Sequence, residues 1–249
     1  MKTSFYLAEH SPDKMLVNGV PSDTVGLYVD RPPMPPMASE EVRKYDLPTG
    51  SVYQRTGYYE DITLNVKCFV FDGGYHPEEI YKWLSGAKTV LFSRCPDYLY
   101  KVKQVSGITP QYKQLGKNYL QVQFICEPFR YTVDNEPQTF DDAEFTIYNR
   151  GNVPCEPVFK IALDSEATAE SLTVNGEELE ITATTIAGET IFVDVPRKKV
   201  WMYEDGVPTV IQNLTSGRFW AQLLQAGWNT VEISSGITSV EVTKNERWL

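Results

Sequence analysis

The chain has 249 residues, an apolar content of 42% and a formal net charge of -10. It contains no apolar run near the ~20 residues of a membrane-spanning helix, and its amino terminus has no signal-peptide core. We therefore expect no membrane insertion, and one large β domain or two ordinary ones. The abundance of Tyr, Phe and Trp favours strands over helices.

The charge is unevenly distributed along the chain. Residues 1–135 contain 15 basic and 15 acidic side chains, whereas residues 136–249 contain 8 and 18. The acidic second half argues against sequence-specific nucleic-acid binding or binding to an anionic membrane, because neutralised phosphates supply much of that affinity. We predict two domains, 1–135 and 136–249.

Short strands are predicted at the beginning of the chain, over residues 4–8, 15–17 and 25–29. Asn18-Gly19 is a turn signal between apolar residues. The proline-rich stretch that follows favours an extended conformation. We expect residues 31–50 to form a long loop, with one helical turn over 39–44. Loops of this length tend to be functional or disordered.

The clearest strand is residues 61–72, which alternates apolar and polar side chains. Phe69 and Phe71 lie on its second face, which therefore needs a cover. The expected cover is a short helix over residues 77–85, whose apolar face contains Trp83. Trp83 is a candidate packing or interface residue. Three further strands are predicted, over residues 89–92, 98–104 and 119–126.

The strand over residues 119–126 precedes a predicted break in the chain. Pro128 cannot donate a hydrogen bond to a sheet, so regular pairing is expected to end just before it. Phe129 and Tyr131 then provide large apolar surface, and they are candidate packing or interface residues. The polar run over 132–142 is expected to be a linker.

The second half alternates short strands with turn signals. Asn175-Gly176 predicts a two-residue hairpin turn. The strands are expected over residues 144–148, 158–163, 171–174, 177–182, 190–195, 199–203, 231–234 and 239–243. This spacing is typical of a β-sandwich or jelly roll.

No motif of a known catalytic or cofactor site is present, and His10 and His76 have no patterned partners. The four cysteines lack metal-finger spacing and are expected to be reduced in a cytoplasmic product. We predict that the chain is not an enzyme and binds no cofactor or metal.

Aromatic residues of the second half are candidates for stacking on sugar rings: Trp201, Trp220 and Trp228. The alternative is packing in a core or interface, and burial explains Trp228 together with its neighbours Leu223 and Leu224. Because a fold does not by itself carry sugar recognition, we expect no binding of the isolated second half to cell-wall polysaccharide.

Several segments resemble the distal tail proteins of siphophages in sequence and order. The amino-terminal domain of that family is matched by residues 55–66, which begin Arg-Thr-Gly-Tyr-Tyr-Glu-Asp, and by residues 80–86, 91–93, 96–101 and 124–131. The galectin-like carboxy-terminal domain is matched by residues 149–157, which begin Asn-Arg-Gly-Asn, and by residues 174–176 and 227–229. Residues 31–50 have no clear match.

The resemblance implies a mainly β chain, with an amino-terminal β-sandwich-like domain containing one short helix and a galectin-like β-sandwich or jelly-roll domain. It implies a homo-hexameric ring in the virion, made in the host cytoplasm, that joins the tail tube protein to tip or baseplate proteins and a receptor-binding protein. Tape measure and DNA would pass through the opening. The alternative is a carbohydrate-binding adhesin that uses the second domain.

Overall fold

The computed structural model describes residues 13–34, 36–71 and 76–249. The predicted strand over 4–8 and His10 lie outside these residues. The chain divides into two compact units, one ending at Val133 and including Leu249, the other spanning Asp134–Trp248. Both are built of strands, with one α-helix among the described residues, so the mainly β class is confirmed. That each unit folds independently stays a prediction.

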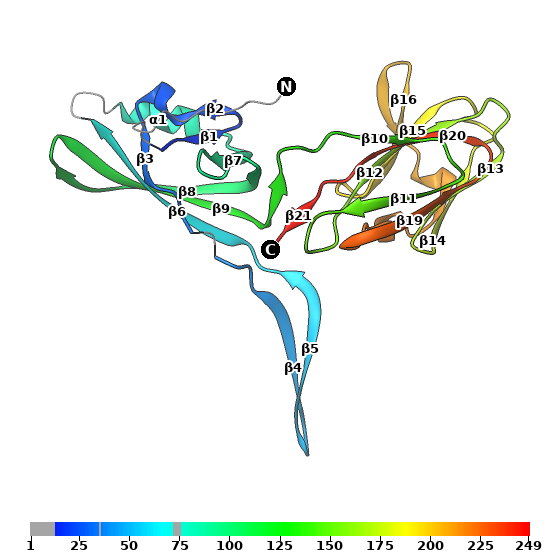
Figure 1. Cartoon of the computed structure of the whole chain (residues 1–249), viewed down its shortest axis with the longest axis horizontal. Helices are drawn as coiled ribbons and strands as arrows, with labels where there is room; N and C mark the ends of the chain where they lie inside the picture. The colour runs from blue at the N-terminus through cyan, green and yellow to red at the C-terminus, as the bar shows by residue number, and fades with distance from the viewer. Residues whose placement is uncertain (1–12, 35, 72–75) are drawn as a thin grey trace. The chain divides into compact units, whose positions relative to one another are not determined.

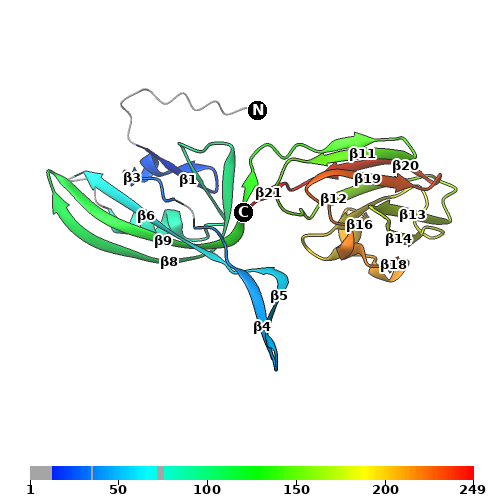
Figure 2. The same ribbon diagram turned by 60° about the horizontal axis from the view of Figure 1, so that its bottom comes forward.

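The first unit is an antiparallel sheet with strand order β2-β1-β7-β8-β9-β6-β3 and a separate two-stranded hairpin, β4–β5 (Figure 1). Its elements are β1 (Met15–Val17), β2 (Val20–Pro21), η1 (Ser22–Val25), β3 (Tyr28–Arg31), β4 (Glu40–Leu47), β5 (Gly50–Tyr59), β6 (Ile62–Phe71), α1 (Pro77–Leu84), β7 (Thr89–Phe92), β8 (Tyr98–Gln114) and β9 (Lys117–Thr132). The pairing of β8 with β9 contains several register shifts, and both strands are bent (Figure 2). In Figure 2, β1 lies over β8 and β9.

The turn between β1 and β2 confirms the Asn18-Gly19 prediction, because both residues have positive φ, 51° and 81°. Two other predictions for this region are wrong. The strand over 25–29 begins only at Tyr28, since η1 and the left-handed Gly26 precede it. Residues 31–50 are not a loop with a helical turn, since β4 pairs with β5 in a hairpin.

The core of the first unit lies on one face of β6. Alternate β6 side chains are buried there, and Ile80 and Leu84 of α1 pack against them. The helix is thus confirmed, but it covers the opposite face from the one predicted. Phe69 is instead enclosed by Tyr28, at 5.6 Å between ring centroids, and by the ammonium of Lys117, 4.1 Å from its ring.

Trp83 packs at the edge of this core and is partly buried, with its indole N–H enclosed and without a hydrogen-bond partner. We expect Trp83→Ala to lower the free energy of unfolding by about 2 kcal/mol. This is below the ~3–5 kcal/mol of a fully buried Trp, because part of the ring already contacts water and its N–H lacks a partner. Urea unfolding followed by circular dichroism measures the change.

The control is Tyr81→Ala on the exposed side of the same helix, where Tyr81 is 49% exposed. We expect this change to stay within about 0.5 kcal/mol of wild type. Equal midpoints for both variants would show that Trp83 contributes nothing to the packing of α1.

The predicted end of pairing at Pro128 is wrong, because β9 continues to Thr132. The pairs Val102↔Cys126 and Tyr100↔Arg130 leave the three residues 127–129 opposite one residue of β8. Pro128 therefore lies in a bulge, where no ladder hydrogen bond is required of it. Phe129 and Tyr131, only 8% and 7% exposed, are packed within the first unit rather than presented to a partner.

The second unit is a sandwich of a six-stranded sheet, β10-β20-β12-β15-β16-β17, and a five-stranded sheet, β11-β19-β13-β14-β18. Apart from β21 (Arg247–Trp248), which belongs to neither of these sheets, its strands are β10 (Gln138–Phe140), β11 (Glu144–Asn149), β12 (Val158–Leu163), β13 (Ala169–Val174), β14 (Glu177–Thr182), β15 (Thr190–Asp194), β16 (Lys199–Glu204), β17 (Val207–Val210), β18 (Thr215–Gly217), β19 (Gly227–Ile233) and β20 (Ile237–Thr243). The short helices η2 (Gln212–Leu214) and η3 (Phe219–Ala221) complete it.

A single core of alternating apolar side chains fills the space between the two sheets. The hairpin turn at Asn175-Gly176 is confirmed, with φ of 52° and 84°. The predicted linker over 132–142 is wrong in part: residues 138–140 form β10, which pairs with β20. The β-sandwich predicted for the second half is confirmed.

Candidate functional site

The described residues hold no group of three or more His, Cys, Asp or Glu side chains placed to bind a metal ion. His76 is exposed at the start of α1. Burial raises the pKa of the Cys126 and Cys155 thiols to about 12, so these are not thiolate nucleophiles at neutral pH. No helix among the described residues is long and apolar enough to cross a membrane.

The hairpin β4–β5, here called the arm, is the largest exposed feature of the first unit. Figures 1 and 2 show it extending away from the sheet of its own unit. Almost every arm residue is exposed. Its large apolar side chains, all 45% exposed or more, are Val42, Tyr45, Leu47, Val52, Tyr53 and Tyr58.

Cross-strand pairing arranges these side chains on both faces of the arm. Tyr45 lies opposite Val52, and Tyr53 lies opposite Lys44. The ion pair of Lys44 with Asp46, at 2.8 Å, is exposed and contributes little in water. A two-stranded hairpin without a core is marginally stable by itself. The arm therefore has the properties of a segment that is completed by a partner.

A second exposed feature lies at the edge of the sandwich formed by β10 and β11. It is a hollow of about 670 Å³, lined by residues of the second unit. Two aromatic side chains border it, Tyr148 of β11 and Trp228 of β19, which are register partners with ring centroids 5.0 Å apart. Trp228 is 73% exposed, so the prediction that burial explains it is wrong.

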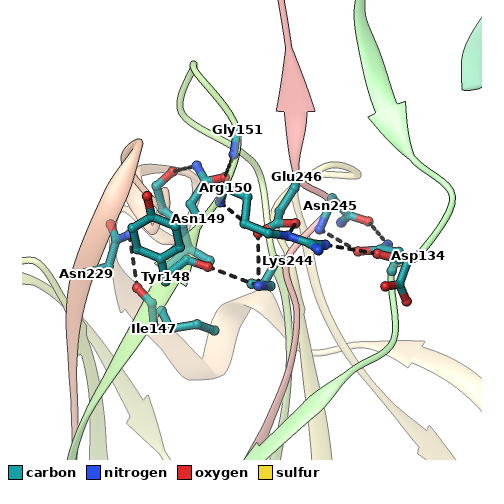
Figure 3. A network of polar contacts seen from close by, with 12 residues as sticks. Asp134, Ile147, Tyr148, Asn149, Arg150, Gly151, Asn229, Lys244, Asn245 and Glu246 are labelled. Atoms are coloured by element: carbon teal, nitrogen blue, oxygen red, sulfur yellow. Dashed lines mark hydrogen bonds and ion pairs between the residues drawn. The ribbon is translucent and has the colours of Figure 1, made fainter. Parts of the chain in front are cut away.

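A buried carboxylate holds two residues of the lining, Arg150 and Lys244. Glu246, 1% exposed, accepts hydrogen bonds from the backbone N–H of Arg150 at 2.8 Å and from its Nε at 2.6 Å. Lys244 Nζ lies 2.9 Å from Oε1, the same oxygen that accepts from the Arg150 backbone, and donates to the Tyr148 carbonyl at 3.0 Å. In Figure 3, Arg150 and Lys244 both point toward Glu246.

Burial by itself would raise the pKa of Glu246, but the hydrogen bonds from Arg150 and Lys244 outweigh it, and the pKa is lowered. Glu246 is therefore ionised at neutral pH, and it neutralises charge from both cations. Because the carboxylate is buried and paired with both cations, the network links residues 150, 244 and 246 within the second unit.

The turn over residues 149–152 is held by side-chain amides. Asn149 Nδ2 donates to the carbonyls of Val153 and Leu224, at 3.2 and 3.1 Å, and its Oδ1 accepts from the N–H of Gly151 at 2.9 Å. A Cβ at Gly151 would lie 2.3 Å from the carbonyl oxygen of Arg247, so only glycine fits there. These contacts explain Asn149 and Gly151 of the Asn-Arg-Gly-Asn sequence.

The other two predicted stacking residues lie away from the hollow. Trp201 of β16 stacks on Phe192 at 4.1 Å with nearly parallel rings, so one of its faces is covered. Trp220 is 50% exposed in η3. The sequence reasoning missed Tyr148, Lys244 and Glu246. Each of them has a partner far along the chain: Trp228 for Tyr148, the Tyr148 carbonyl for Lys244 and Arg150 for Glu246.

The second unit matches a known protein family. Residues 150–248 match the family model described as "Siphovirus-type tail component, C-terminal domain". A search of curated protein sequences finds no match.

Solved structures share the fold of the whole chain. One match is the crystal structure of the Dit protein of phage SPP1, with a TM-score of 0.73 and 17% sequence identity. The match covers 96% of this chain and 100% of that chain. That protein is described as a paradigm of hub adsorption apparatus in phages that infect Gram-positive bacteria. A chain of the phage P2 baseplate in its activated conformation matches with a TM-score of 0.50 and 8% identity, over 93% of this chain and 96% of that chain. The family model over the second unit and the shared fold over the whole chain confirm the resemblance to the siphophage distal tail proteins.

Proposed function

We propose that the protein is a structural, non-enzymatic hub of a siphophage tail tip. Copies of the first unit close into a homo-hexameric ring that continues the tail tube and carries tip or baseplate proteins, including a receptor-binding protein. The tape measure and the DNA pass through the opening. The protein is made in the host cytoplasm and resides in the virion.

The observation that carries this proposal is the arm. It presents large apolar side chains from a hairpin that has no core, which favours a neighbouring copy as the surface that covers it. Head-to-tail contacts that close give rings. The balanced charge of residues 1–135 favours packing of several copies, and the acidic second half favours solubility. The number six comes from the family resemblance.

Native mass spectrometry over a concentration series, followed by negative-stain imaging, tests the proposal. We expect a closed ring of six copies, formed by the chain alone or with the adjacent tail proteins co-expressed. A chain that stays monomeric at high concentration and forms no ring with those proteins present would defeat the hub function.

A further inference from the structure

The exposure of Trp228 and Tyr148 distinguishes this pair from the other aromatic side chains of the second unit. Their rings project from neighbouring positions on β19 and β11 and are 73% and 46% exposed. Exposed single aromatic residues are common, but here an adjacent Trp and Tyr lie at the rim of a hollow. Their ring planes are tilted by 58° to one another, so together they form an angled apolar platform. Trp201 forms no such platform, because Phe192 covers one of its faces.

The hollow beside the platform has the size of a small-molecule site. Its volume of about 670 Å³ lies within the ~300–1,000 Å³ of such sites. It is open along the rim where β10 and β11 each pair with a single strand, so a ligand can enter from the side.

Polar groups with hydrogen-bonding capacity surround the platform. Gln138 and Thr146 are exposed on the lining, and the described contacts leave the amide and the hydroxyl without partners. Arg150 uses its Nε for Glu246 and its Nη2 for the Asp134 carbonyl, at 3.5 Å, which leaves Nη1 as a donor. An aromatic plane ringed by amide, hydroxyl and guanidinium groups matches the chemistry of a saccharide, which has an apolar face and a rim of hydroxyls.

The electrostatics argue against an anionic ligand. Glu246 accepts from both Arg150 and Lys244 and so neutralises much of their charge. Glu136 adds a further negative charge to the lining. Neither cation is therefore free to pair with a phosphate or a carboxylate ligand. An uncharged ligand does not need such a pairing.

We propose that the second unit binds an uncharged saccharide in this hollow, with one pyranose ring stacked on Trp228 against Tyr148. Its hydroxyls bond to Gln138, Thr146 and Arg150. This replaces the expectation of no binding, which was based on the principle that a fold alone does not carry sugar recognition. The site lies within the second unit, so it does not depend on the ring.

A glycan array probed with the full chain, carrying hexoses, N-acetylhexosamines and their oligomers, tests the site. Isothermal titration with each saccharide bound on the array then gives its Kd. We expect at least one saturable ligand, and a loss of affinity of about tenfold or more in Trp228→Ala and in Tyr148→Ala. Both side chains are exposed, so neither change is expected to unfold the protein, and a melting curve checks this.

The matched controls are Trp201→Ala and Trp220→Ala, which remove Trp side chains from the same unit outside the hollow. We expect both to keep the wild-type Kd within about twofold. No bound saccharide on the array, or binding that survives Trp228→Ala, would overturn the proposal. Loss of binding in Trp201→Ala with full binding in Trp228→Ala would do the same.

Discussion

Removal of the arm is expected to abolish the ring while the rest of the first unit stays folded. Glu40 and Tyr59 are cross-strand partners, so an Asn-Gly turn in place of residues 41–58 joins them without strain. The deletion removes six exposed apolar side chains and none of the buried core of the first unit. Native mass spectrometry should find monomers at concentrations where the wild type assembles. The circular dichroism spectrum should keep its strand shape and lose only the contribution of the deleted strand residues of β4 and β5.

Point substitutions test whether the apolar side chains of the arm, and not only the presence of the hairpin, hold the ring together. Tyr45→Ser with Tyr53→Ser keeps the hairpin but removes two large contact side chains, and we expect it to weaken assembly strongly. Tyr203→Ser, which changes a 50% exposed Tyr in the second unit, is the matched control and should still form rings. Rings formed by the deletion variant would show that other surfaces of the first unit hold the copies together.

The arm also shows where prediction from the sequence fails. Pattern predicts a strand when one face is buried and alternates with a polar face. The arm buries neither face, so Val42, Tyr45 and Leu47 fall at irregular spacing, and the prolines before residue 40 suggested a loop. By contrast, the bounds of β6 were predicted to within one residue at each end. Its apolar and polar side chains alternate because one face of the strand packs in the core.

Pro128 illustrates a second limit. The inference that proline cannot donate to a sheet is sound, but a bulge meets that constraint without ending the strand. The sequence does not reveal the bulge, because it depends on how β8 shifts its register against β9. The predicted linker was too long for a similar reason, since β10 is fixed by its pairing with β20.

The hollow of the second unit could be predicted only in part. The sequence reasoning named three candidate Trp residues, Trp228 among them, but could not tell an exposed ring from a buried one. Tyr148 and Trp228 are brought together by the pairing of β11 with β19, which are far apart in the sequence. Glu246 lies among charged residues at the end of the chain and looks solvated, although the fold buries it.

Glu246→Gln is expected to lower the free energy of unfolding of the second unit by about 3 kcal/mol at neutral pH, because removing one member of a buried charged group leaves the others unpaired. Glutamine keeps one acceptor oxygen but turns an NH₂ group toward a cation. The carboxylate now accepts from Arg150 at 2.8 and 2.6 Å and contacts Lys244 at 2.9 Å. Urea unfolding of the full chain at pH 7 measures the change.

The matched control is Glu241→Gln. The Glu241 carboxylate pairs with Lys160 at 3.3 Å but is 34% exposed, so its loss should cost less than about 1 kcal/mol.

The pH dependence of stability gives a second test. Because folding lowers the pKa of Glu246, its contribution is complete above the ordinary value of 4.5 and is lost as the pH falls through the lower folded value. The gap between wild type and Glu246→Gln should therefore shrink below pH 4.5. A gap that stays constant down to low pH, or one no larger than that of Glu241→Gln, would show that the ionised carboxylate does not hold this edge of the sandwich together.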